Sequence, residues 1–382
     1  MRSAIAALLR PEDPSPRRIA AIRIASIAVF GVLPAFMILT PVVDVMAGNA
    51  AWAFRDAFLG AAEAVVRGDS PYPALEDPAL ERGTAYVYPP LMALLVVPFT
   101  WLSANAAAGA FALILVAAVP ATLWVAGVRD WRCYGLALLW PPVLSAVHGE
   151  NISLLMALAA ALVWRFRDRP LVAGAALGAS IAVKPLLWPL GVWLLVSRRL
   201  AAVVWSAAVA LVLLVGSWAV IGFAGLRDYP DLVRHLSGLM DEWGYTVYAL
   251  ALDAGAETGP ARVLGTLLAA ALFAACVVLA RRGDDRRAFV LATAAVIASS
   301  PIVWLHYFVL LLVVVSVAQP RLGLVWFVPL VMFGSEEVAN GTAFQTALAL
   351  VAAALTIGIA LRGSPSVPRQ VLVAAPATGR PG

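Results

Sequence analysis

The sequence predicts an all-α polytopic membrane protein, and its composition and its apolar patterning both point there. Of the 382 residues, 63% are hydrophobic and only 13% are charged, and the mean hydropathy is +0.91. Soluble globular proteins carry about 25% charged residues, so this chain lacks the polar surface that a soluble protein needs. Apolar stretches of bilayer-crossing length recur along it, and we expect a transmembrane helical bundle of about 11–13 membrane segments.

The apolar stretches follow one another along most of the chain. Lys184 and Pro185 interrupt one of them, which we expect to fold as two short helices hinged at the proline. One segment within 86–128 is expected to be re-entrant, because broken helices are tolerated at membrane depth where they line a polar cavity. The stretches lie at about 19–43, 86–102, 106–128, 133–147, 151–164, 170–197, 200–222, 263–281, 287–300, 301–319, 323–336 and 341–361.

Short arginine clusters between these stretches account for the net charge of +5. They lie at 165–169, 198–199 and 281–287, and clusters of this kind mark cytoplasmic loops. We interpret them as topological signals and expect no nucleic-acid partner. The expected organisation is a cytoplasmic tail at 1–18, a single membrane domain at 19–361 and a disordered tail at 362–382, in a multi-pass protein of the plasma (inner) membrane.

Two polar stretches separate the apolar ones. The first, at 44–85, is expected to be an extracytoplasmic loop, and its amphipathic piece Asp56–Arg67 predicts a helix lying in the membrane interface. The second, at 223–262, contains Trp243, Tyr245 and Tyr248, which are typical of an interfacial aromatic belt.

Few ionisable residues occur near the apolar stretches, and such residues are functional candidates because their burial is costly. Lys184, the chain's one lysine, is a candidate anion ligand, or it extends its amine to the interface. His306 is a second candidate, unless a backbone carbonyl satisfies it. His148, Glu150 and Asn151 form a polar hinge that is either part of a site or a simple turn.

The sequence offers little sign of a cofactor. Cys133 and Cys276 both fall in apolar stretches and form no CxxC pattern. There is no nucleotide-binding glycine motif and no HExxH helix. We therefore expect neither a metal nor a cofactor.

Several motifs resemble one enzyme family. The run Gly68–Pro73, then Tyr86-Val87-Tyr88-Pro89-Pro90, resembles the first-loop and Tyr-Pro-Pro signature of actinobacterial polyprenol-phosphate-mannose-dependent α-mannosyltransferases, which belong to the GT-C superfamily. Three later segments resemble further motifs of that family in the same order, namely Gly149-Glu150-Asn151, Ala173-Gly174 to Lys184-Pro185, and Ser300-Pro301-Ile302-Val303-Trp304-Leu305-His306.

The resemblance implies a membrane transferase with its active site on the extracytoplasmic side. The donor would be a mannosyl phosphate on a polyprenyl lipid, and the acceptor a glycolipid or lipoglycan among the membrane lipids. A first-loop aspartate would act as general base and the motif histidine would join the active site, so Asp56 and His306 become the expected catalytic residues. In the family this aspartate lies slightly further from the glycine that matches Gly68 than Asp56 does, and at that distance the present chain has Ala53 or Phe54. Asp44 and Glu150 are therefore alternative candidates for the base.

The chemistry of such a transfer fits these residue types. A base must take the proton of the acceptor hydroxyl, and positive charge must stabilise the departing lipid phosphate. Lys184 and His306 suit the second task, and the expected substrate-binding residues are Lys184, Tyr72, Tyr86, Tyr88, His148, Glu150 and Asn151. Alternative functions are a polyprenyl-phospho-arabinose-dependent arabinofuranosyltransferase, or a non-enzymatic lipid-sugar transporter or scaffold.

Overall fold

The computed structural model describes residues 16–240, 242–335 and 342–363, and in these ranges the protein is helical with no strand. The all-α prediction is confirmed. The first helix, α2 (Pro16–Ile27), begins inside the expected tail at 1–18, whose other residues lie outside the described ranges. The expected disordered tail at 362–382 also lies outside them, except for Arg362 and Gly363.

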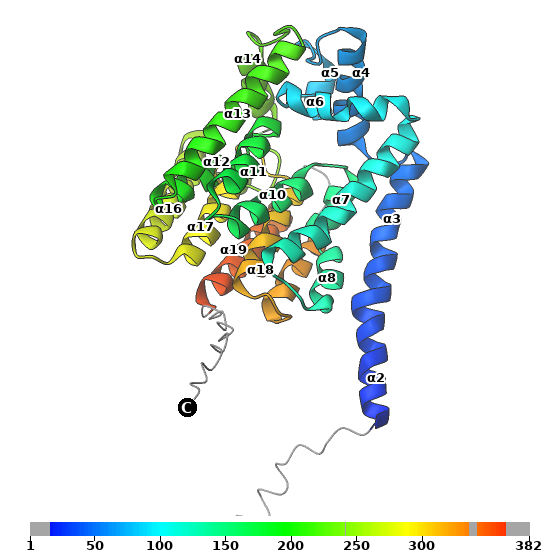
Figure 1. Ribbon diagram of the computed structural model, residues 1–382, viewed down its shortest axis with the longest axis vertical. Coiled ribbons are helices and arrows are strands. Elements are labelled where there is room, and N and C mark those ends of the chain that lie inside the picture. Colours follow the sequence, from blue (N-terminus) through cyan, green and yellow to red (C-terminus); the bar gives the residue numbers. More distant parts are fainter. Residues whose placement is uncertain (1–15, 241, 336–341, 364–382) are drawn as a thin grey trace, which may run out of the picture.

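Within the described ranges, five helices are long and apolar enough to cross a membrane, so the chain is a multi-pass membrane protein. The first runs unbroken through α2, the π-helical turn η1 (Ala28–Val32) and α3 (Leu33–Ala47), and it stands along one edge of the molecule (Figure 1). Its 32 residues span roughly 48 Å, more than the apolar thickness of a bilayer. The other four are α7 (Ala104–Ala126), α13 (Leu200–Val220), α16 (Thr258–Arg281) and α19 (Ala343–Arg362).

Most of the remaining apolar stretches fold as helices too short to cross alone. The expected hinge at Pro185 is confirmed, because 170–197 divides there into two helices. The stretch 133–147 divides in the same way, since Pro141 and Pro142 end one helix and begin the next. The short elements are α6 (Pro90–Val96), η3 (Val97–Trp101), α8 (Trp131–Leu138), α9 (Pro141–His148), α10 (Ser153–Arg165), α11 (Pro170–Val183), α12 (Trp188–Val196), α17 (Asp285–Ala298), η4 (Leu305–Leu310), α18 (Leu311–Ala318) and η5 (Leu324–Gly334).

The short helices bring the arginine clusters to one end of the molecule, which we call the arginine end. There Asp285, the first residue of α17, pairs with Arg167 at 2.8 Å and with Arg199 at 2.7 Å. The guanidinium of Arg286 donates to backbone carbonyls at the C-terminal end of α19. If every apolar stretch crossed the membrane once, these arginine clusters could not all lie on one side of it. Pairs of short helices, in which the first enters the membrane and the second returns to the same side, allow that arrangement.

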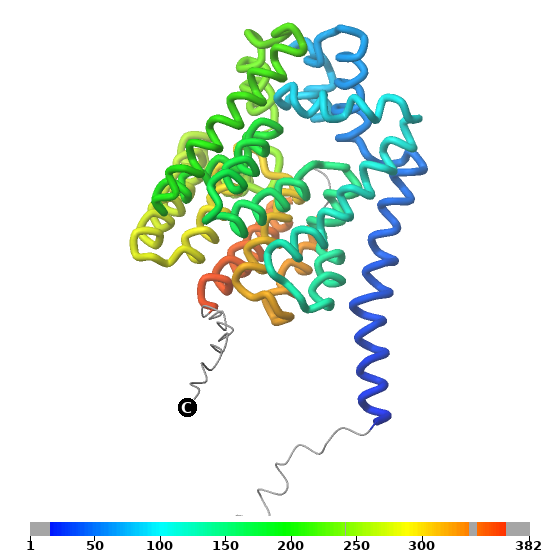
Figure 2. The backbone as a smooth tube through the Cα atoms, in the orientation of Figure 1, coloured from blue at the N-terminus to red at the C-terminus, as the bar shows by residue number. Residues whose placement is uncertain are grey.

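The two polar stretches pack together at the opposite end, which we call the loop end (Figure 2). The first contributes η2 (Ala53–Leu59), α4 (Gly60–Arg67) and α5 (Pro78–Glu81). In the second, α14 (Tyr229–Met240) packs against α5, while α15 (Val247–Asp253) packs against α16 and α19. Tyr72 stacks on Trp218 with ring centres 5.4 Å apart. The expected belt residue Tyr245 is instead only 1% exposed, and its backbone N–H donates to the carbonyl of Val303.

A seam of small residues holds α11 against α13. A methyl group on Gly174 or Gly178 would come within 2.5 Å of α13, so the two backbones touch at these glycines. The facing residues on α13 include Ala202, Ser206 and Ala210. Small residues four positions apart allow this close approach in membrane helices. The seam thereby fixes the position of the C-terminal end of α11, where Lys184 lies.

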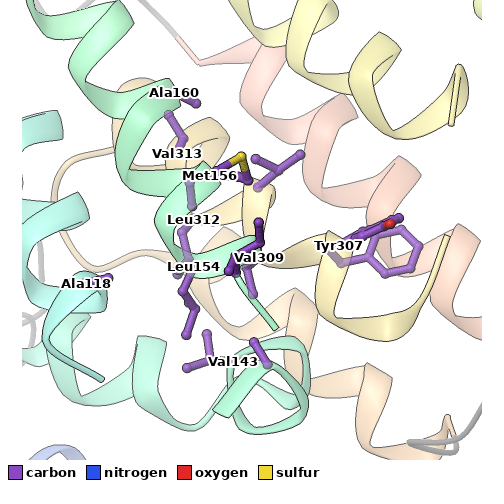
Figure 3. Packing of buried hydrophobic residues seen from close by; sticks show 14 of the residues in the cluster. Ala118, Val143, Leu154, Met156, Ala160, Tyr307, Val309, Leu312 and Val313 are labelled. Carbon is purple, nitrogen blue, oxygen red and sulfur yellow. The ribbon is translucent and has the colours of Figure 1, made fainter. Parts of the chain in front are cut away.

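The centre of the bundle is a dry apolar core. Leu154 and Met156 of α10 pack with Leu312 and Val313 of α18 (Figure 3), and all four side chains are at most 4% exposed. Tyr307 lies to one side of this column.

Candidate active site

Lys184 lies at the break between α11 and α12. Pro185 has no N–H to continue the helix, and the backbone of Lys184 is extended, with φ −152°. Its Nζ is buried and has no hydrogen-bond partner among the described residues. The amine lies 4.2 Å from the ring centre of Tyr307 and 5.3 Å from that of Tyr88. Lys184 therefore does not extend to the interface; it points into an aromatic enclosure.

His306 joins the same enclosure from another part of the chain. It lies in the first turn of η4, it is 2% exposed, and its Nε2 has no hydrogen-bond partner among the described residues. Its ring meets that of Tyr307 edge-on, with centres 5.1 Å apart. His306 is also close enough to Lys184 for their charges to repel. Two buried nitrogen groups thus converge with no anion from the described chain between them.

The polar hinge after α9 borders this enclosure. The amide of Asn151 lies 3.5 Å from the hydroxyl of Tyr88, and its oxygen accepts hydrogen bonds from Ser153 at the start of α10. The carbonyl of His148 accepts from the N–H of Ala51, which joins the hinge to the first loop. The hinge is therefore more than a solvated turn, because it connects the first loop to the residues around Lys184.

Glu150 is fully buried, and neither carboxylate oxygen has a hydrogen-bond partner among the described residues. Its backbone has φ +53°, a left-handed conformation that non-glycine residues seldom adopt. Arg55 lies near enough to attract its charge, while the arginine's terminal nitrogens bond Asn105 and the carbonyl of Val45. Sequence reasoning missed Arg55, which reads as an ordinary residue of an amphipathic helix.

Asp56 lies elsewhere, in an open pocket of about 500 Å³ at the loop end. It is exposed in the first turn of η2, and it makes no ion pair or hydrogen bond with any residue that the structure describes. Arg82 and Asp77 also line this pocket, and sequence reasoning missed both. A helix does form over the expected segment, but it begins at Ala53 with a π-helical turn rather than at Asp56. The pocket lining includes Asp56, Gly60, Ser70, Tyr72, Asp77, Arg82, Thr84 and Tyr86.

A row of tyrosines connects the pocket to the enclosure. The ring of Tyr86 is 5.7 Å from that of Tyr72 and 6.0 Å from that of Tyr88. The hydroxyl of Tyr72 donates to the carbonyl of Tyr88, and that of Tyr86 donates to Pro89 and accepts from the N–H of Ala93. Burial raises the pKa of Tyr72 above its ordinary value, so it remains a neutral donor. Both hydroxyls hold the Tyr-Pro-Pro turn, and the rings remain to line the pocket.

Three further positions considered for the base lie outside this pocket, namely Asp44, Ala53 and Phe54. Asp44 is in α3, a part of the first long helix, and it does not line the pocket. Phe54 is fully buried and stacks on Phe111 with ring centres 4.6 Å apart. Most of the predicted residues thus divide into two groups: Asp56, Tyr72 and Tyr86 in the pocket, and Lys184, His306, Tyr88 and Asn151 around the enclosure. His148 and Glu150 belong to the hinge and line neither the pocket nor the aromatic rings. No cluster of three metal-ligating residues occurs in the described ranges.

Comparison with known proteins identifies the class. A profile of glycosyltransferase family 87 matches residues 86–303, more than half of the chain. The chain therefore belongs to glycosyltransferase family 87, and it is a membrane glycosyltransferase. The matched range contains Tyr86, Tyr88, the polar hinge and Lys184, while Asp56 and His306 lie outside it. No curated protein and no solved structure matches the chain.

Proposed function

We propose that this glycosyltransferase moves a mannosyl residue from a polyprenyl-phosphate donor to a glycolipid or lipoglycan acceptor, at the loop end of the molecule. The observation that carries the proposal is the pair of buried nitrogen groups of Lys184 and His306, which have no hydrogen-bond partner in the part of the chain that the structure describes. A buried ammonium without a counter-ion is costly, and a lipid-linked phosphate supplies the missing negative charge. The same arrangement explains why Tyr88 and Tyr307 enclose the amine.

The donor reaches such a site from the membrane. Its isoprenoid chain is apolar and remains among the helices, while its phosphate reaches the break between α11 and α12. When the bond from the sugar's anomeric carbon to the phosphate oxygen breaks, the polyprenyl phosphate leaves with the electron pair. Lys184 stabilises the charge that develops on it, and His306 donates a hydrogen bond or a proton, which lowers the transition-state energy.

The acceptor enters through the pocket at the loop end, whose polar and aromatic residues suit a sugar. Asp56 accepts the proton of the acceptor hydroxyl as that oxygen forms its bond to the anomeric carbon. The acceptor attacks from the face opposite the leaving phosphate, so the transfer inverts the configuration. The loop end faces the extracytoplasmic side of the plasma membrane in this proposal, because the arginine end carries the clusters that favour the cytoplasm.

An in vitro transfer assay tests the proposal. Purified protein is given polyprenyl-phosphomannose, radiolabelled in the sugar, with a panel of glycolipid acceptors, and products are separated by thin-layer chromatography. We expect a labelled glycolipid from the wild type and at least a hundredfold less of it from His306→Ala, on the order of 10²–10³-fold. Transfer from polyprenyl-phospho-arabinose alone would replace the mannosyl donor, because the phosphate is common to both. No transfer from either donor, in correctly inserted protein, would favour the transporter or scaffold.

A further inference from the structure

A second cavity lies at the arginine end, far from the proposed reaction. It has a volume of about 720 Å³, and it lies between the C-terminal ends of α12 and α16, with Leu195, Val196, Ser197, Arg198, Ala280 and Arg281 as its lining. None of these residues belongs to the pocket or to the enclosure described above. The cavity therefore needs an explanation of its own.

The charges around this cavity differ from those of its surroundings. Arg167, Arg199 and Arg287 each form an ion pair with an aspartate. The side chains of Arg198 and Arg281 form no ion pair or hydrogen bond with any part of the chain that the structure describes. The carbonyls that end α12 and α16 offset part of this positive charge, but two full charges exceed them.

Arg198 and Arg199 are neighbours in the chain, but their side chains point to different places. Arg198 has φ +61°, a left-handed conformation that non-glycine residues seldom adopt. Arg199 reaches Asp285 and Asp168, while Arg198 lines the cavity. Beside them the hydroxyl of Ser197 is buried and has no hydrogen-bond partner among the described residues.

Exposed aliphatic side chains of α12 and α16 lie in the lining of the cavity and near it along α16. Leu195 is 50% exposed and Val278 of α16 is 46% exposed, and only 6% of the most apolar part of α16 is buried in the protein. Basic groups at the end of a membrane-crossing helix lie at the depth of lipid headgroups. Positive charge and a hydroxyl at headgroup depth, above exposed aliphatic side chains, match a phosphate that carries acyl chains.

We propose that this cavity binds the phosphate of an anionic phospholipid, whose acyl chains lie along the exposed faces of α12 and α16. Arg198 and Arg281 pair with the phosphate, and the Ser197 hydroxyl donates to it. The site is independent of the transfer reaction, and it anchors the end of α12, the helix that follows Lys184.

Native mass spectrometry of the protein released from nanodiscs tests this site. The nanodiscs contain phosphatidylcholine and phosphatidylglycerol, and we expect the wild type to retain phosphatidylglycerol. In Arg198→Gln/Arg281→Gln retention should fall about tenfold. The matched control is Arg165→Gln/Arg282→Gln, which removes the same charge from exposed arginines outside the cavity and should change retention less than twofold.

Two outcomes would overturn the proposal. Equal loss in both double variants would show diffuse attraction of lipid to a basic surface, and unchanged retention in Arg198→Gln/Arg281→Gln would show that the cavity holds no phospholipid. If the double variant does not fold, Arg281→Gln alone serves, because it lies at the exposed end of α16. Glycosyl transfer measured in the same variants separates this site from the proposed function, because neither arginine touches the reacting groups.

Discussion

The arginine end and the enclosure around Lys184 differ in how their charged groups are paired: the ion pairs of the arginine end are partly buried, whereas the amine in the enclosure is buried. At the arginine end, the carboxylate of Asp285 accepts hydrogen bonds from Arg167, Arg199 and the indole of Trp193. In the enclosure, the Nζ of Lys184 and the Nε2 of His306 have no such partner among the described residues. Both regions are built from short helices of the same bundle. They differ in whether their charged groups have partners, and not in the kind of secondary structure that carries them.

This contrast separates two roles for charge. A paired cluster ties helix ends together, and removing one partner leaves the others uncompensated. An unpaired group lowers the stability of the empty protein, so its presence calls for a ligand that pairs with it. Each region therefore predicts a different response to mutation: loss of folding stability at the arginine end, and loss of activity at the enclosure and the pocket.

The largest expected effect is that of Asp56→Asn. This substitution keeps the size and exposure of the side chain but removes the proposed base, so we expect the transfer rate to fall about 10²–10⁴-fold with unchanged thermal stability. The control is Asp77→Asn in the same pocket, because Asp77 caps α5 and asparagine caps helices as well. Full activity in Asp56→Asn would move the base to Glu150 or Asp44, which Glu150→Gln and Asp44→Asn would distinguish.

His306→Ala should reduce transfer by a similar factor, about 10²–10³-fold. The imidazole lies against Tyr307 beside Lys184, and its removal takes away a donor for the leaving phosphate. Steady-state rates with saturating donor measure the loss. Near-wild-type rates would return His306 to a packing role in η4.

Lys184→Met tests the contrast most directly. We expect kcat/KM for the donor to fall about 10²-fold, while the thermal midpoint of the ligand-free protein stays the same or rises, because an unpaired buried charge is removed. Donor titrations and melting curves on one preparation give both quantities. A lowered midpoint with unchanged donor kinetics would mean that Lys184 serves the fold.

Asp285→Asn should show the reverse pattern. Two arginines lose their less exposed counter-ion and keep only the exposed carboxylate of Asp168. We therefore expect a loss of about 2 kcal/mol in the free energy of unfolding, with activity per folded molecule within about threefold of wild type. Asp168→Asn is the control, because this side chain is 73% exposed and its pairing contributes less than about 1 kcal/mol. Equal effects in the two variants would contradict the pairing argument.

The smallest expected effect is a pH dependence at the arginine end. Hydrogen bonds from Arg132 lower the pKa of Asp130 to about 2, and the N–H of Leu322 contributes as well. A carboxylate with a lowered folded-state pKa stabilises the fold above its unfolded pKa of about 4 and loses that stabilisation as the pH falls toward 2. Asp130→Asn should therefore be less stable by on the order of 1 kcal/mol near neutral pH, and denaturant titrations should show the gap narrowing below about pH 4. A gap that does not change with pH would exclude this carboxylate as its source.

The sequence by itself determined the class of structure and the candidate residues. A chain with 63% hydrophobic residues and recurrent apolar stretches can satisfy its backbone in a membrane as helices. The break at Lys184–Pro185 was also predictable, because proline interrupts helical hydrogen bonding locally. The motifs at 86–90, 149–151 and 184–185 fall within the range that glycosyltransferase family 87 matches.

Only the tertiary structure decided which of these residues meet. Periodicity describes one helix at a time, whereas the contacts of Tyr88, Lys184 and Tyr307 join three distant segments. The tertiary structure also places Asp56 in the loop-end pocket, apart from the enclosure, and it buries Glu150 near Arg55. The physical reason is that burial and pairing depend on how helices pack, and here the glycine seam between α11 and α13 sets where α11 ends in space.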